Sequence, residues 1–286
     1  MQSIQVGLLG IGTVGSGTYQ VLSRNRDEIS RRSGRVMELS MLADLNVERA
    51  RSIVDDSVRV VADAREVIHN PQIDIVVELI GGCGIAKDLV LEAIAAGKHV
   101  VTANKALLAV HGAEIFAAAR KNGVMLGFEA AVAGGIPIIK VLREGLAANR
   151  IDWVAGIING TSNFILTQMR EKGLDFSQAL AEAQRLGYAE ADPTFDVEGV
   201  DAAHKITLMS SIAFGVPLQF GQVDVEGISS LQALDIQFAE RLGCRIKLLA
   251  ITRRHDAGIE MRVHPALVPT SSLLAHVEDA MNAVMV

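Results

Sequence analysis

The segment that most constrains the fold is a glycine-rich turn close to the N-terminus. Residues 10–15 read Gly-Ile-Gly-Thr-Val-Gly, a G-x-G-x-x-G pattern between the apolar run Ile4–Leu9 and the helical pattern Val14–Arg24. Glycine is needed where a chain turns tightly from strand to helix and where its backbone approaches a pyrophosphate. Free N–H groups and the dipole at the helix start favour an anion there. The pattern predicts dinucleotide binding through the turn that holds Gly10, Gly12 and Gly15; the alternative is a tight turn in a glycine-rich sheet protein.

The first half of the chain alternates short apolar runs with helical patterns. The expected strands are Ile4–Leu9, Met37–Ala43, Val58–Val61, Ile73–Ile80, His99–Thr102 and Val124–Phe128. The expected helices are Val14–Arg24, a helix ending at Ile68, Leu89–Ala96 and Ala113–Lys121. Strands that are apolar on both faces and alternate with helices predict a parallel sheet covered on both sides. Residues 1–130 are therefore expected to form an α/β domain, a Rossmann-type doubly wound parallel sheet that binds a dinucleotide.

The pattern changes near residue 130, after which helices and strands no longer alternate. The expected helices are Ile138–Gly145, Asn163–Lys172, Phe176–Leu186, Val200–Phe214 and Leu231–Leu242, and the expected strands are Ile151–Ile158, Ile246–Thr252 and Ile259–Val263. This mixture predicts an α+β domain over residues 131–286, which we expect to bind the substrate.

The composition excludes several classes of partner. The 286 residues carry a formal net charge of −6 without a basic block, which argues against nucleic acid and anionic membranes. The chain has no run of about 18 uncharged apolar residues, so no membrane span is expected. Without a targeting signal, the cytoplasm is the expected location. Cys83 and Cys244 lie far apart without metal-type spacing, so a disulfide framework is not expected.

Asp44 follows the second expected strand, where a dinucleotide-binding fold places the acid that binds the adenosine ribose. It lies further from the glycines than the usual spacing of about 20 residues, because the polar stretch Asn25–Arg35 intervenes. A carboxylate here repels a 2′-phosphate and favours NAD, whereas Arg49 and Arg51 are placed to pair with that phosphate. The choice between NAD and NADP stays open, as does a role for Asp44 in capping the following helix.

Two lysines are candidates for chemistry. Lys105 follows Thr102 at the carboxyl end of an expected strand, which in an open α/β sheet faces the ligand crevice. Lys205 lies four residues after Asp201 on an expected helix, so the two side chains share one face. A charged pair on an otherwise apolar face is costly unless it is paired or used. The alternatives are a solvated lysine at residue 105 and a surface ion pair at residues 201 and 205.

Further polar groups precede this pair. The segment from Gly187 to Asp196 places Glu190 and Asp196 around a proline that blocks regular helix. The sequence Asn159-Gly160-Thr161 ends a strand and opens a helix, whose N–H groups and threonine hydroxyl suit a carboxylate; a plain helix cap is the alternative. Acids bind an ammonium, so an amino-acid substrate fits. Hydride transfer from an alcohol also needs a base, and a lysine acts as one only if burial or a like charge lowers its pKa.

Six segments in this order make the chain resemble homoserine dehydrogenase over nearly all of its length. They are Gly10–Gly15, Thr102–Lys105, Glu129–Ile136, Asn159–Thr161, Gly187–Asp192 and Gly199–Lys205. The resemblance implies NAD(P)-dependent interconversion of L-homoserine and L-aspartate 4-semialdehyde, on the route to threonine and methionine. It also implies a homodimer formed through the second domain.

The resemblance also assigns roles to residues. Lys205 corresponds to the catalytic proton donor and acceptor, and Lys105 to its partner near the nicotinamide. Glu190 and Asp201 correspond to the homoserine-binding acids, with Asp196, Gly160 and Thr161 in the same polar site. Thr13 and Val14 fall in the cofactor turn, and Thr102 and Gly187 correspond to further cofactor contacts. The family binds a sodium ion through backbone oxygens, and the matching positions are Glu129, Val132, Gly134 and Ile136.

The chain departs from the family at its end. It stops at the apolar segment Asn282–Val286, where the family continues into a segment that returns to the nucleotide domain and often into a regulatory domain. A truncated chain is therefore expected, without feedback through such a domain. Two alternatives follow: a protein that binds a dinucleotide without catalysis, and a dehydrogenase for a related hydroxy or amino acid.

Overall fold

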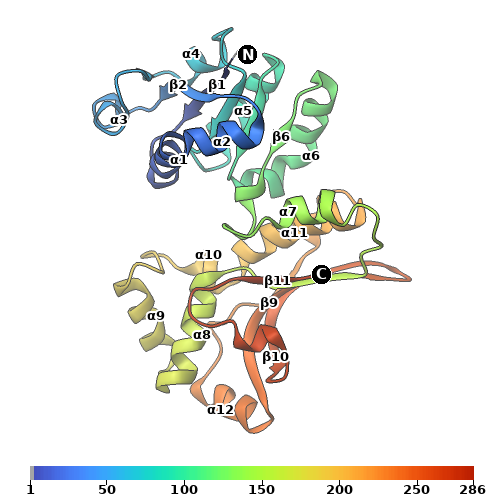
Figure 1. Cartoon of the computed structure of the whole chain (residues 1–286). Coiled ribbons are helices and arrows are strands. Elements are labelled where there is room, and N and C mark those ends of the chain that lie inside the picture. Colours follow the sequence, from blue (N-terminus) through green and yellow to red (C-terminus); the bar gives the residue numbers. More distant parts are fainter. Residues whose placement is uncertain (1–2) are drawn as a thin grey trace. The chain divides into compact units, whose positions relative to one another are not determined.

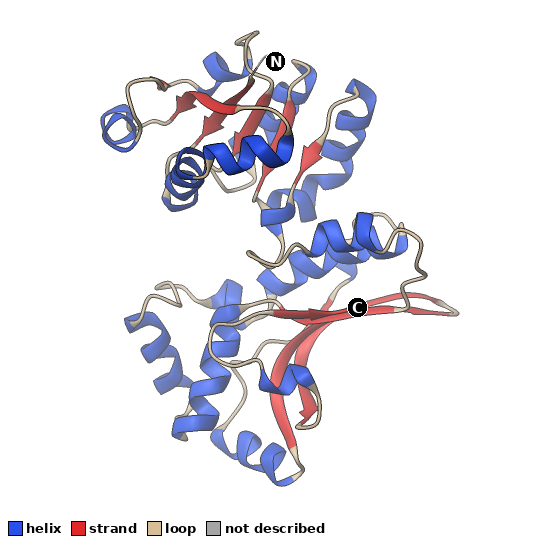
Figure 2. Ribbon diagram, in the orientation of Figure 1, coloured by secondary structure: helices blue, strands red, loops and turns tan. Residues whose placement is uncertain are grey.

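The computed structural model describes residues 3–286, which form two compact units (Figures 1 and 2). Unit 1 ends at Ala131, and unit 2 comprises Val132–Val286. Each unit is built around one sheet, of six strands in unit 1 and five in unit 2.

The sheet of unit 1 is parallel throughout. Its strands are β1 (Ile4–Leu9), β2 (Met37–Ala43), β3 (Arg59–Val61), β4 (Ile75–Glu78), β5 (His99–Thr102) and β6 (Leu126–Gly127). They lie in the order β3-β2-β1-β4-β5-β6, which is the strand order of a Rossmann fold. The predicted α/β class of this half is confirmed.

Helices connect these strands. They are α1 (Thr13–Arg24), α2 (Arg26–Ser33), α3 (Val47–Ile53), α4 (Ala64–Ile68), α5 (Gly84–Ala95) and α6 (Lys105–Asn122), followed by a 3₁₀ turn at Glu129–Ala131. The polar stretch before β2 forms the separate helix α2. Helix α6 begins at Lys105, earlier than predicted, because the Asn104 side chain accepts the Leu107 N–H at 3.1 Å and caps the helix start.

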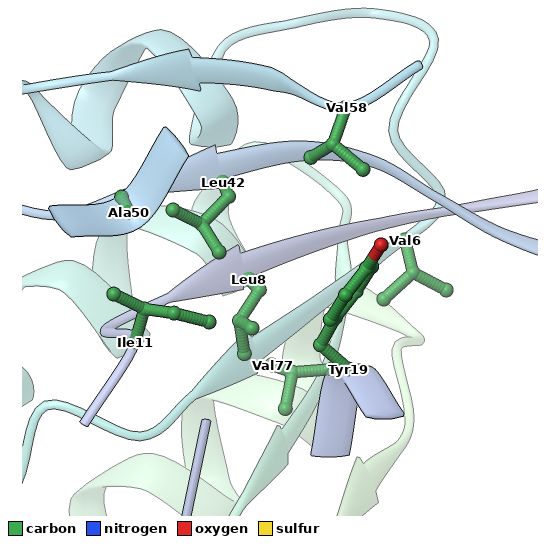
Figure 3. Close-up of a cluster of buried hydrophobic side chains, with 8 residues drawn as sticks. All are labelled: Val6, Leu8, Ile11, Tyr19, Leu42, Ala50, Val58 and Val77. Atoms are coloured by element: carbon green, nitrogen blue, oxygen red, sulfur yellow. The ribbon is translucent and has the colours of Figure 1, made fainter. Parts of the chain in front are cut away.

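One face of this sheet packs a cluster of buried side chains (Figure 3). Val6 and Leu8 of β1 contribute to it, together with Tyr19 of α1 and Ala50 of α3. On the other face, the space where Gly7 would carry a Cβ is filled by Val67 of α4. Since successive side chains of a strand point to opposite faces, β1 is buried on both sides from Val6 onward, as its largely apolar sequence predicts.

Unit 2 holds a mixed sheet and helices. Its strands are β7 (Trp153–Ile157), β8 (Asp224–Val225), β9 (Cys244–His255), β10 (Gly258–Pro269) and β11 (Ala283–Met285), in the order β11-β7-β9-β10-β8. Only the pair of β8 and β10 is parallel among these strands of residues 132–286. The helices are α7 (Ile138–Lys140), a π-helical turn at Val141–Gly145, α8 (Gly160–Lys172), α9 (Phe176–Arg185), α10 (Thr194–Val197), α11 (Val200–Phe214) and α12 (Ala233–Arg241), with 3₁₀ turns at Phe220–Gln222 and Leu273–His276.

The long strand β9 organises this unit. Ile157 of β7, Leu249 of β9 and Val268 of β10 form a buried cluster with the 3₁₀ turn at Leu273–His276. Helix α11 also packs against β9, where the Thr252 hydroxyl bonds to the Ser210 hydroxyl at 2.9 Å. Helices α8 and α11 therefore both pack against β9. Across residues 3–286, no helix combines the length and apolar character needed to cross a membrane.

Candidate active site

The glycine turn of unit 1 uses its three glycines differently. Gly10 has a φ of +93°, and a Cβ there would lie 2.9 Å from the Leu79 carbonyl oxygen. A Cβ on Gly15 would lie 2.1 Å from the Gly10 carbonyl oxygen. A Cβ on Gly12 would meet nothing within 4 Å. Gly10 and Gly15 are thus required by backbone packing, whereas Gly12 leaves open space at the start of α1.

That helix start has the properties of an anion site. Thr13 and Val14 are the first residues of α1, and the preceding Gly12 supplies no side-chain cap. The first N–H groups of a helix have no partners within the helix, so they are available to a phosphate. A cavity of about 410 Å³ is lined by Gly10, Gly12 and Asp44 among others.

Asp44 lies at the end of β2, beside the glycine turn. Its Oδ2 accepts the Ile11 N–H and its Oδ1 accepts the Asn46 N–H, each at 2.8 Å. The carboxylate therefore ties the glycine turn to the start of α3, and each oxygen keeps a further lone pair for a ligand hydroxyl. Helix α3 itself is capped by Asn46, whose side chain accepts the Arg49 N–H. Arg49 also lines the cavity.

A buried acid that sequence reasoning missed lies at the end of β4. Glu78 is fully buried; its Oε1 accepts the N–H groups of Ile80 (2.9 Å) and Gly81 (3.1 Å), and its Oε2 accepts the Thr102 hydroxyl at 2.7 Å. It joins the ends of β4 and β5. The sequence does offer a signal for this residue, because Glu78 is an acid at the end of the otherwise apolar strand Ile75–Glu78.

Lys105 is the first residue of α6, directly after β5. The Thr102 hydroxyl accepts the Asn104 N–H at 2.9 Å, and the Asn104 amide donates to the Gly82 carbonyl at 2.6 Å. The buried Glu78 network therefore fixes the turn from which Lys105 projects. The structure places Lys105 at the carboxyl edge of the sheet, as its sequence position predicts.

In unit 2, Lys205 and Asp201 form an ion pair. Lys205 Nζ lies 2.5 Å from Asp201 Oδ2 and donates to the Ile158 carbonyl at 2.7 Å. The Lys205 side chain is 14% exposed and that of Asp201 only 3%. An ammonium has three N–H groups, so these two contacts leave one for a further oxygen. The predicted sharing of one face is confirmed, and the pair is buried rather than at the surface.

Asn159 brings a second acid to this pair. Its amide nitrogen donates to Asp196 Oδ1 at 2.7 Å and to Asp201 Oδ2 at 2.8 Å. Its amide oxygen accepts the Ser162 N–H at 2.8 Å, which caps α8. The sequence indicated the cap and not the bridge between acids, because residues 159, 196 and 201 are brought together only by tertiary folding.

Two predicted loop segments meet at the same helix start. The Thr161 hydroxyl donates to the Tyr188 carbonyl at 2.6 Å, directly after Gly187, which has a φ of +80°. Gly160 is the first residue of α8, and a Cβ there would lie 2.7 Å from the Ala280 carbonyl oxygen. The Thr161 hydroxyl hydrogen is therefore engaged, so a ligand would meet its lone pairs.

Glu190 is exposed, and its backbone carbonyl accepts the Gln184 amide at 3.0 Å. Within residues 3–286, no hydrogen bond or ion pair is seen between its carboxylate and the Lys205–Asp201 pair. Its role in substrate binding stays a prediction.

The segment expected to hold sodium has irregular backbone. Glu129 opens a 3₁₀ turn in unit 1, and Val132, Gly134 and Ile136 follow in unit 2. Ala133 has a φ of +44°, which L residues rarely adopt, and the Ile136 carbonyl accepts the Ile138 N–H at 2.8 Å. Residues 3–286 contain no cluster of three His, Cys, Asp or Glu side chains suited to a metal. That result does not bear on a site built from backbone carbonyls.

Comparison with known proteins identifies the family. A family model described as "Homoserine dehydrogenase, NAD binding domain" matches residues 10–129, and one described as "Homoserine dehydrogenase" matches residues 137–286. The chain belongs to the homoserine dehydrogenase family. The predicted resemblance is confirmed, and the two matches together contain the glycine turn, Lys105, Asn159 and Lys205.

Named homoserine dehydrogenases are similar to the whole of this chain. The homoserine dehydrogenase of Pseudomonas aeruginosa is 60% identical over all of the chain, and that of Neisseria gonorrhoeae is 60% identical over all of it. The chain covers 65% and 66% of those two relatives, so it spans slightly less than two thirds of their length.

Solved homoserine dehydrogenase structures share the fold. One from Thiobacillus denitrificans has a TM-score of 0.96 and 60% identity, covering 99% of this chain and 65% of that one. A hyperthermophilic archaeal homoserine dehydrogenase in complex with NADPH has a TM-score of 0.82 and 25% identity, covering 99% of this chain and 87% of that one. The sheet order and mixed second sheet described above are thus those of homoserine dehydrogenases.

Proposed function

We propose that this chain is an oxidoreductase that interconverts L-homoserine and L-aspartate 4-semialdehyde with NAD or NADP, in the biosynthesis of threonine and methionine. The observation that carries the proposal is the buried Lys205–Asp201 ion pair, bridged by Asn159 to Asp196, in a member of the homoserine dehydrogenase family.

Residues 1–130 are proposed as the dinucleotide domain. The fit is supported by the open space at Gly12, the uncapped start of α1 at Thr13 and Val14, and the cavity beside Asp44. Gly10, Gly15, Thr102 and Gly187 are the remaining proposed cofactor positions. When bound, the cofactor supplies a nicotinamide that accepts or returns a hydride. Both forms remain candidates, because Asp44 suits a ribose hydroxyl and Arg49 suits a 2′-phosphate.

Residues 131–286 are proposed to bind the substrate, with Lys205 moving its proton. In the oxidative direction the hydroxyl O–H bond breaks, its proton passes to the neutral amine of Lys205, and the electron pair forms the carbonyl as the C4 hydride departs. In the reductive direction the ammonium returns the proton. The Ile158 carbonyl and Asp201 orient the amine, and Lys105 assists at the reacting oxygen.

The acids and the start of α8 are proposed to hold the rest of the substrate. Asp196, Asp201 and Glu190 suit its ammonium, and the N–H groups at Gly160 and Thr161 suit its carboxylate. We also propose a sodium ion on the carbonyls of Glu129, Val132, Gly134 and Ile136, a homodimer through residues 131–286, and a cytoplasmic location. Turnover measured with and without sodium, sedimentation, and cell fractionation test these three points in turn.

The function is tested with Lys205→Ala. Removing the proton acceptor should lower kcat by roughly 10²–10⁴-fold in homoserine-dependent NAD(P)H formation, while the affinity for the cofactor is retained. Lys172→Ala, at an exposed position at the end of α8, is the matched control and should keep wild-type kinetics. Near-normal turnover by Lys205→Ala would refute the assignment.

The wild-type chain separates the alternatives. Cofactor binding without any turnover would favour a non-catalytic dinucleotide-binding protein. Faster turnover of another hydroxy or amino acid than of homoserine would favour a related dehydrogenase. Parallel assays with NAD and NADP decide the cofactor preference.

A further inference from the structure

We propose that Asn159 is a positioning residue of the Lys205 site, whose amide holds Asp196 and Asp201 as a fixed pair of carboxylates for the substrate's ammonium. The proposal rests on the proposed function, because it concerns the same site. It gives Asn159 a role beyond that of the helix cap which its place at the start of α8 already explains.

The contacts of Asn159 use the two ends of the amide for separate tasks. The oxygen caps α8 by accepting the Ser162 N–H at 2.8 Å. The nitrogen has two hydrogens, and these go to Asp196 Oδ1 at 2.7 Å and Asp201 Oδ2 at 2.8 Å. Capping needs the oxygen alone. The helix therefore does not account for the two bonds from the nitrogen.

The two acids would repel each other without this donor. Asp196 lies on α10 and Asp201 on the first turn of α11, and both converge on one nitrogen. Asp201 is 2% exposed and Asp196 is partly buried, and the amide between them is 5% exposed, so water screens this side of the two carboxylates less than it would at the surface. A neutral group that donates one hydrogen to each carboxylate lets the pair stand close together while both stay oriented.

Asn159 also bears on the proton-transfer group. Asp201 Oδ2 accepts from both Asn159 and Lys205, and the Lys205 ammonium also donates to the carbonyl of Ile158, the residue before Asn159. The Ile158 carbonyl thus contacts Lys205, and the Asn159 amide contacts Asp201. A shift of the Asn159 amide would move Asp201 and, through it, the Lys205 nitrogen.

The test uses two substitutions that keep the cap. Aspartate and serine are as good at a helix start as asparagine. Asn159→Asp keeps the capping oxygen, removes both hydrogens and adds a third carboxylate; Asn159→Ser keeps one donor. The matched control is Asp175→Asn at the exposed N-cap of α9, where aspartate is replaced by asparagine instead of asparagine by aspartate.

Steady-state kinetics and calorimetric titration with L-homoserine in the presence of oxidised cofactor provide the readouts. For Asn159→Asp we expect kcat to fall by roughly 10²-fold, the typical effect of an ångström-scale misplacement, and homoserine affinity to fall at least about tenfold. Cofactor affinity should change by less than about twofold. A variant that was largely unfolded would lose its cofactor affinity as well, so this result would exclude general unfolding as the cause. Asn159→Ser should be intermediate, and Asp175→Asn should match the wild type.

The outcomes of this test are distinct. Wild-type kcat, KM and homoserine affinity in Asn159→Asp would overturn the positioning role while leaving the proposed function intact. A wild-type chain that neither binds nor oxidises homoserine would overturn both. If Asn159→Asp does not fold, Asn159→Ser decides: wild-type kinetics refute the role, and reduced kcat with unchanged cofactor affinity supports it.

Discussion

Lys247 is predicted to make the stability of unit 2 depend on pH in the alkaline range. This residue of β9 is 2% exposed, and its Nζ donates to the Val277 carbonyl at 2.6 Å and to Asn163 Oδ1 at 3.1 Å. Both acceptors are neutral. Burial lowers the pKa of Lys247 from 10.5 to about 8, because the charged form loses its hydration.

The neighbouring charges act on this lysine in opposite directions. Glu278 raises its pKa, while Arg170 and Arg245 lower it, and Asp279 raises it slightly. Glu278 is itself paired with both arginines. The carboxylate is therefore shared between two cations, and its attraction for the Lys247 ammonium is weaker than the effect of burial.

The sign and size of the effect follow from proton linkage. Above pH 8 the folded state has released the Lys247 proton, whereas the unfolded state keeps it up to pH 10.5, so the free energy of unfolding rises with pH across this window. The full displacement is worth about 3 kcal/mol, of which about 2.5 kcal/mol develops between pH 7 and pH 10.

Lys247→Met isolates this contribution. At pH 7 the variant is free of the burial cost of the charge and loses two hydrogen bonds. The Asn163 oxygen loses its donor, at roughly 1–3 kcal/mol, whereas the Val277 carbonyl still accepts the Asn163 amide at 3.0 Å, so the stability of the variant should lie close to that of the wild type. At pH 10 it should be less stable than the wild type by about 2.5 kcal/mol, because the wild type alone has been relieved of the charge.

The assay is urea unfolding of both proteins at pH 7 and pH 10, read by circular dichroism. The difference in the free energy of unfolding between the wild type and the variant is compared at the two pH values. Groups that titrate equally in both proteins do not contribute to this comparison. Lys172→Met, at an exposed position, is the control and should show the same difference at both pH values. Parallel pH dependence of wild type and Lys247→Met would show that the buried ammonium is not the cause.

Two further predictions concern unit 1. Gly15→Ala should destabilise the protein by about 1–3 kcal/mol and weaken NAD(P)H binding at least about tenfold, since its Cβ would lie 2.1 Å from a carbonyl oxygen; Gly17→Ala, with nothing within 4 Å, should instead gain about 0.5–1 kcal/mol, and equal melting temperatures of the two variants would contradict the packing argument. Glu78→Ala should lower the free energy of unfolding by roughly 2–3 kcal/mol, because it leaves the buried Thr102 hydroxyl and the partly buried N–H groups of Ile80 and Gly81 without their acceptor; a loss under about 1 kcal/mol in urea unfolding would count against this network.

Elements with a strong local or periodic signal were predictable. The glycine pattern of residues 10–15 is a local signal, and Gly15 packs against the carbonyl of nearby Gly10; β1 is apolar apart from Gln5, because side chains pack on both of its faces. Helix α11 has the predicted bounds, Val200–Phe214, because glycines flank it on both sides in left-handed conformations.

Elements held by other forces were harder to predict. Helix α2 is polar except for Ile29 and has no buried residue; ion pairs of Glu28 with Arg31 and Arg32 and the left-handed Gly34 support it. Hydrophobic periodicity cannot detect such a helix. Strand β6 is only Leu126–Gly127, shorter than its apolar sequence suggested, because pairing with β5 and not local propensity sets its length.

The same distinction applies to the candidate site. The Asp201–Lys205 pair follows from helical spacing, so the sequence reveals it. The bond from Asn159 to Asp201 joins residues 42 apart and depends on how α8, α10 and α11 pack. From the sequence, Asn159 is therefore interpreted only as a helix cap, and the structure adds the hydrogen bonds from its amide nitrogen to the two acids.

Three buried ionisable side chains differ in the hydrogen-bond partners that surround them, and this difference determines how each should affect stability. Glu78 accepts bonds from three donors at the carboxyl edge of the parallel sheet, so its negative charge is matched where it lies. Asp201 accepts from a cation and from an amide. Lys247 meets only neutral acceptors directly, and the carboxylate nearest to it is already shared by two arginines. A buried ammonium that lacks a matched partner gives up its proton at a pH where an exposed lysine would keep it. For that reason the stability contributed by Lys247 should depend on pH, whereas Glu78 and Asp201 are each held by groups that donate to them.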